Sequence, residues 1–172
     1  MTRLTYLLLI TATTLLLACS SQVKNDTDEQ TEAQATEASP QEMLNEAYQL
    51  FKEGDDAASI LLATQVLELG RETKNDTLVG RALTSLCRNA QRSLDTTKLA
   101  ELSSELEDLA ATSGNKQWLM YRAHMNAEMW RLIGDMDRAE EFYTESMKIS
   151  LALGATGMYT IDHFNKSFVS TA

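Results

Sequence analysis

Apolar and small residues recur along residues 41–172 at the spacing of amphipathic helices, and the whole pattern repeats about every 40 residues. Five columns of the repeat are matched: Asp55, Asp95 and Asp135; Ala47, Cys87 and Ala127; Leu62, Leu102 and Phe142; Leu69, Leu109 and Ile149; Leu78, Trp118 and Met158. A fixed period in this range is typical of stacked helical hairpins that cannot bury their apolar faces alone. The pattern therefore predicts an all-α solenoid of about three 40-residue repeats.

Each repeat divides into two helices at a Gly-Asp or Leu-Asp step. The expected pairs are 41–53 with 56–73, 77–93 with 96–112, and 116–133 with 136–153, followed by a capping helix over 156–169. Asp after the break can cap the next helix by accepting its free N–H groups, and Gly114 and Gly154 can end the second helices. The domain organisation expected is thus a helical domain over 41–172, preceded by segments of a different kind.

The segment Gly134-Asp135-Met136-Asp137-Arg138-Ala139-Glu140-Glu141-Phe142-Tyr143 resembles the middle of a tetratricopeptide repeat. Residues 52–58 are a looser version, and the second repeat has lost most of the motif. The standard repeat is shorter, at about 34 residues, so this chain is similar to the long-helix variants of that family. The resemblance implies a right-handed solenoid whose first helices line a concave groove. A plain helical bundle is the alternative.

Residues 1–18 have the pattern of a secretion signal. A basic start with Arg3 precedes an uncharged Leu-rich run over 4–17, which is shorter than the roughly 20 residues of a bilayer span. Leu16-Leu17-Ala18-Cys19 resembles the bacterial lipobox, although a smaller residue is more usual at Leu17. The resemblance implies cleavage before Cys19, lipid on its thiol and amine, and, because Ser20 follows rather than Asp, an outer-membrane protein facing the periplasm. A plain signal peptide or an uncleaved anchor is the alternative.

Residues 19–40 form an acidic linker in which Val23 is the one sizeable apolar residue after the cysteine. Such a segment buries too little surface to offset its ordering entropy, so we expect a disordered tether between the membrane and the helical domain. The whole chain carries a formal charge of -10. Because phosphate backbones repel such a chain, nucleic acid is excluded as a partner class.

The sequence offers no constellation that points to catalysis, so we expect a non-enzymatic protein without a cofactor other than the covalent lipid. Its two histidines, His124 and His163, lack a second ligand at metal-binding spacing. No nucleophile motif or phosphate loop is present. Cys87 shares its column with alanines, which favours a small residue at a helix crossing.

The better candidate for function is a basic, partly aromatic face on the first helices. Arg81, Arg88 and Arg92 share one helix face, and the tetratricopeptide resemblance places them on the groove lining. The full predicted set is Tyr48, Phe51, Lys52, Arg81, Arg88, Arg92, Tyr121, His124 and Arg131. Arginines pair carboxylates bidentately, so an acidic or C-terminal peptide would suit such a groove. Alternatively, these arginines bridge to neighbouring carboxylates and only keep the surface soluble.

Two functions follow as hypotheses. The first is a membrane-anchored lipoprotein whose helical domain acts as a binding scaffold for a protein or peptide partner in the cell envelope. The second is a structural or inhibitory lipoprotein that acts through its outer or end surface, without a peptide groove.

Overall fold

The computed structural model describes residues 38–170, which form seven α-helices and contain no strand. The helices are α1 (Pro40–Glu53), α2 (Asp56–Glu72), α3 (Asp76–Arg92), α4 (Thr96–Ser113), α5 (Lys116–Ile133), α6 (Met136–Leu153) and α7 (Thr156–Val169). The predicted all-α repeat arrangement is confirmed, and the helix bounds agree closely with the expected ones. The predicted signal sequence, Cys19 and the predicted linker as far as residue 37 lie outside the described residues.

Identical caps explain why the helices begin where they do. The side chains of Asp55, Asp95 and Asp135 accept hydrogen bonds from the backbone N–H three residues later, at 3.1, 2.9 and 3.1 Å. Asn75 and Asn115 cap α3 and α5 in a related way. Each cap satisfies an N–H that has no partner within its own helix. The second helix of each of the three repeats therefore begins with the same Asp cap at the same position of the repeat.

The helix ends are equally regular, because within residues 38–170 the backbone turns left-handed at six evenly spaced positions. Four of the six are Gly54, Gly114, Gly134 and Gly154, and the other two are Lys74 and Leu94. At both exceptions the next N–H still closes the helix end: Asn75 donates to the Gly70 carbonyl at 2.8 Å, and Asp95 to the Ala90 carbonyl at 2.9 Å. The turn geometry thus persists where the glycine that normally supports it is missing.

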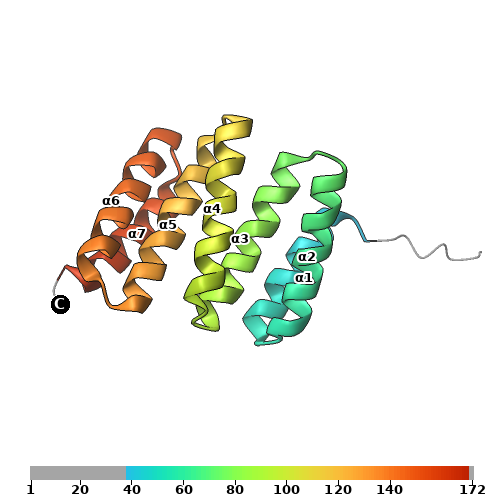
Figure 1. The fold of residues 1–172 in the computed structure, drawn as a ribbon, viewed down its shortest axis with the longest axis horizontal. Coiled ribbons are helices and arrows are strands. Elements are labelled where there is room, and N and C mark those ends of the chain that lie inside the picture. Colours follow the sequence, from blue (N-terminus) through green and yellow to red (C-terminus); the bar gives the residue numbers. More distant parts are fainter. Residues whose placement is uncertain (1–37, 171–172) are drawn as a thin grey trace, which may run out of the picture. The chain divides into compact units, whose positions relative to one another are not determined.

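The helices pack in chain order, each against the next, as Figure 1 shows. Beyond these neighbours, α1 contacts α3 and α3 contacts α5, whereas the second helices α2, α4 and α6 make no comparable contacts with one another. The first helices of the repeats therefore form a layer of their own. Side chains of α7 also contact α5, since Asp162 lies against His124 and Asn165 donates to Glu128. We call the surface formed by α1, α3, α5 and α7 the inner face.

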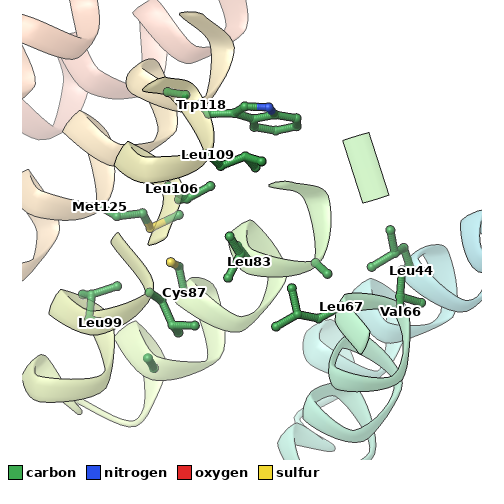
Figure 2. Packing of buried hydrophobic residues seen from close by; sticks show 14 residues of the cluster. Leu44, Val66, Leu67, Leu83, Cys87, Leu99, Leu106, Leu109, Trp118 and Met125 are labelled. Atoms are coloured by element: carbon green, nitrogen blue, oxygen red, sulfur yellow. The ribbon is translucent and has the colours of Figure 1, made fainter. Parts of the chain in front are cut away.

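The main core lies where the first helices α1, α3 and α5 pack against the second helices α2 and α4 (Figure 2). Cys87 is fully buried there among Leu83, Leu99 and Met125. Its equivalents, Ala47 and Ala127, are also fully buried. A second cluster around Tyr143 joins α5, α6 and α7. This packing fixes the spacing of the first helices and hence the geometry of the inner face.

Candidate functional site: a basic cavity on the inner face

A cavity of about 500 Å³ opens on the inner face between α1, α3 and α5. Its lining follows the register of the repeat, because many lining residues occur in pairs one repeat apart. Three such pairs are Leu44 with Thr84, Tyr48 with Arg88, and Arg81 with Tyr121. The remaining lining residues are Asn45, Thr77, Ser85, Gln117 and Trp118. Four of the predicted groove residues, Tyr48, Arg81, Arg88 and Tyr121, are therefore brought together in one cavity.

The arginines of this cavity differ from the others in their partners. Seven arginines lie within residues 38–170. Five of them form ion pairs with carboxylates: Arg71, Arg92, Arg122, Arg131 and Arg138. The remaining two are Arg81, which donates to the Gln41 side-chain oxygen, and Arg88, whose guanidinium carbon lies 5.6 Å from the centre of the Tyr48 ring. Among residues 38–170, no Asp or Glu lines the cavity, so its described lining is basic within an acidic chain.

Aromatic side chains form the walls around these two arginines. Tyr48 is 46% exposed, and Tyr121 stacks on Trp118 with ring centres 6.2 Å apart. Trp118 itself is buried, because Gly80 leaves room for it: a Cβ at Gly80 would lie 2.5 Å from the indole ring. The indole N–H is buried without an acceptor within the described residues. The cavity thus combines two cations with two tyrosines, side chains suited to an anionic, hydrogen-bond-accepting group.

Phe51, Lys52 and Arg92 lie beside the cavity rather than in its lining. Arg92 pairs with Asp56 at 2.9 Å, donates to the Phe51 carbonyl and places its guanidinium carbon 3.5 Å from the Phe51 ring centre. The Lys52 ammonium lies 5.1 Å from the Tyr48 ring centre. Arg92 is therefore engaged in intramolecular contacts, as the alternative interpretation of these arginines expected, whereas Arg81 and Arg88 pair with no carboxylate of the described residues.

His124 and Arg131 belong to a different part of the inner face. His124 is buried, and its Nδ1 lies 2.6 Å from Oδ1 of the fully buried Asp162 on α7. Arg131 pairs with Glu128 at 2.7 Å. A second cavity of about 300 Å³ lies here, lined by Gln91, Glu128, Arg131, Asn165 and Phe168. The structure therefore separates these two predicted residues from the basic cavity.

Sequence reasoning missed Glu128, which is only 2% exposed. Its carboxylate accepts hydrogen bonds from Gln91 of α3, Tyr143 of α6 and Asn165 of α7 as well as from Arg131. Burial, together with the hydrogen bond to Glu128, raises the pKa of the Tyr143 hydroxyl. The sequence does hold a signal for Glu128: it occupies the same repeat position as Tyr48 and Arg88, which both line the basic cavity.

Within residues 38–170, His, Cys, Asp and Glu nowhere cluster in threes as a metal site would require, and no helix is both long and apolar enough to cross a membrane. Burial raises the pKa of the Cys87 thiol to about 12, which keeps it protonated and unreactive at neutral pH.

No protein-family model matches this chain, and no match was found among curated proteins or among solved structures.

Proposed function

We propose that this protein is a lipoprotein, anchored through Cys19 to the outer membrane, whose tetratricopeptide-like helical domain binds a protein or peptide partner in the periplasm through its inner face. The lipobox resemblance supports the anchor. The acidic segment over 19–40 supports a spacer between the membrane and the helices.

The observation that carries the binding role is the pair Arg81 and Arg88. Leaving two guanidinium groups without carboxylates is unexpected in a chain with 25 acidic and 15 basic residues, where the other described arginines are all paired. Arginine is the preferred side chain for binding carboxylates because its planar fork donates two parallel hydrogen bonds. Together with exposed Tyr48, the pair has the composition of an interface centre, in which tyrosine and arginine are enriched.

The test is crosslinking in cells followed by purification of the membrane-tethered chain. Arg81→Glu/Arg88→Glu should lose the crosslinked partner, because reversal of two charges replaces attraction with repulsion at the centre of the interface. Arg71→Glu/Arg138→Glu is the matched control: both residues are exposed arginines outside the cavity. It should retain the partner, and circular dichroism should show the same helical signal for both variants.

Retention of the partner by Arg81→Glu/Arg88→Glu would contradict binding through the inner face and favour the outer or end surface. A Cys19→Ser arm of the same experiment tests the anchor, since this variant should no longer incorporate labelled fatty acid. Continued incorporation of labelled fatty acid by Cys19→Ser would contradict lipid attachment to Cys19.

A further inference from the structure

The inner face continues beyond the basic cavity onto α7, where its character changes. Ile161 occupies the position of Arg81 and Tyr121, and Phe164 and Phe168 occupy those of Thr84 and Arg88. These three α7 residues are 49%, 61% and 59% exposed. The columns that are basic and polar on α3 are thus apolar and solvent-facing on α7.

Ile161, Phe164 and Phe168 do not lie on the side of α7 that corresponds to the α6-facing side of α5. On α5 that surface includes Met120, Ala123 and Ala127, all buried. The equivalent residues of α7 are Thr160, His163 and Ser167, which are polar and exposed. The large apolar side chains of α7 therefore follow the register of the inner face.

Two polar contacts fix α7 in the inner layer. Asp162 meets His124 and Asn165 donates to Glu128 at 2.8 Å, so both connect α7 to α5. The cavity of about 300 Å³ connects Gln91 of α3 with Phe168 of α7. The inner face accordingly runs from α1 to α7, with Arg81 and Arg88 on α3 and its exposed apolar residues on α7.

We propose that the partner presents an amphipathic segment with carboxylates at one end and large apolar side chains at the other, lying across the first helices from α3 to α7. The inference rests on the proposed function and specifies its ligand. Charge complementarity places the carboxylates against Arg81 and Arg88, and the apolar end covers Ile161 and Phe164. First helices spaced by about 10 Å put α3 and α7 about 20 Å apart. A helix of roughly 13 residues, or an extended segment of about 6, spans that distance.

Synthetic helical peptides of about 14 residues, long enough to span that distance, provide the probe. Their binding to the whole chain is measured by fluorescence anisotropy. One peptide has three glutamates in its first turn and leucine and two phenylalanines in its last two turns, on an alanine–glutamine background. A second has the reverse order, and a third has the same residues interleaved. We expect one segregated peptide to bind at least about ten-fold more tightly than the interleaved peptide, because only segregation satisfies both halves of the face.

A variant of the apolar half and a matched control then test where the apolar end binds. Ile161→Ser/Phe164→Ser should reduce the affinity of the segregated peptide to that of the interleaved one. Leu61→Ser/Leu151→Ser, which changes equally exposed apolar residues on α2 and α6, should not. Thermal unfolding of each variant reports whether its fold is intact.

Equal affinity for segregated and interleaved peptides would overturn the inference, as would full affinity in Ile161→Ser/Phe164→Ser. Sedimentation showing a dimer that this variant dissociates would also overturn it, by assigning the α7 residues to a second copy of the chain. None of these results would restore or remove the crosslinked partner in cells, so the proposed function stands or falls separately.

Discussion

Leu94 adopts a backbone conformation that L-residues rarely tolerate, with φ of 60° where the other first-to-second helix turns have Gly54 and Gly134. Its Cβ crowds the backbone in this left-handed region, whereas glycine has no such penalty. The side chain is 66% exposed, so it gains little from burial in return. The second repeat therefore retains the turn of its neighbours at a cost in stability.

Leu94→Gly should accordingly raise the free energy of unfolding by about 1 kcal/mol, because it relieves the left-handed strain without removing a core contact. Urea denaturation followed by circular dichroism measures the change. Leu61→Gly is the matched control, since Leu61 is 59% exposed inside α2 and should lose about 1 kcal/mol through poor helix propensity. A loss of stability in Leu94→Gly would refute the strain argument.

At the same scale, the sequence predicts which arginines share a helix face but not which of them are paired. Arg88 and Arg92 are one turn apart and are indistinguishable by pattern. Asp56, the partner of Arg92, lies far earlier in the chain and reaches it only through packing of α2 near α3. Pairing of surface charges depends on such long-range placement, which periodicity does not contain.

Whole elements were far easier to predict, because their boundaries depend on local chemistry. Asp and Asn caps with glycine turns fix where the helices begin and end, and the apolar rhythm between them fixes which face is buried. Contacts among three or more helices were not predictable in this way. Glu128 occupies the same repeat position as Tyr48 and Arg88, which places it on the inner face, but the pattern of α5 does not show that side chains from α3, α6 and α7 bond to it.

Glu128→Gln should lower the free energy of unfolding by about 2 kcal/mol, because the amide presents N–H groups to donors that now bond a buried carboxylate. Chemical denaturation provides the measurement. Glu145→Gln is the control: Glu145 pairs with Arg122 at 2.7 Å at a partly exposed site, so its loss should be below about 1 kcal/mol. Equal effects of the two substitutions would show that the Glu128 contacts do not tie the helices together.

Across the whole molecule, burial of Cys87 in the main core makes its thiol a reporter of the stack's opening. The pKa of the folded thiol, about 12, exceeds its ordinary value of 9.0. Below pH 9 the thiol is protonated in both the folded and the unfolded protein, so the contribution of the buried neutral thiol to folding stability is fully present. Between about pH 9 and 12 only the unfolded thiol ionises, so this contribution to stability is lost as pH rises.

In a Cys19→Ser chain, iodoacetamide at pH 8 should therefore modify Cys87 only on opening, and much faster in denaturant. Mass spectrometry measures the modified fraction over time. Cys87→Ala, which introduces the residue found in the other repeats, should also lessen the fall in unfolding free energy above pH 9. Rapid labelling of the native chain would contradict burial of the thiol in a closed core.

The evenly spaced left-handed turns have a consequence for how such a chain can grow. Residues 75–114 begin and end at equivalent junctions, since Asn75 and Asn115 both cap the helix that follows. Duplicating residues 75–114 would place an Asn-capped helix start after each copy, as in the present chain. It would also insert another copy of Arg81 and Arg88 about 10 Å further along the stack. Gene duplication could thus lengthen the basic surface in steps of one repeat, without requiring a new turn or a new core.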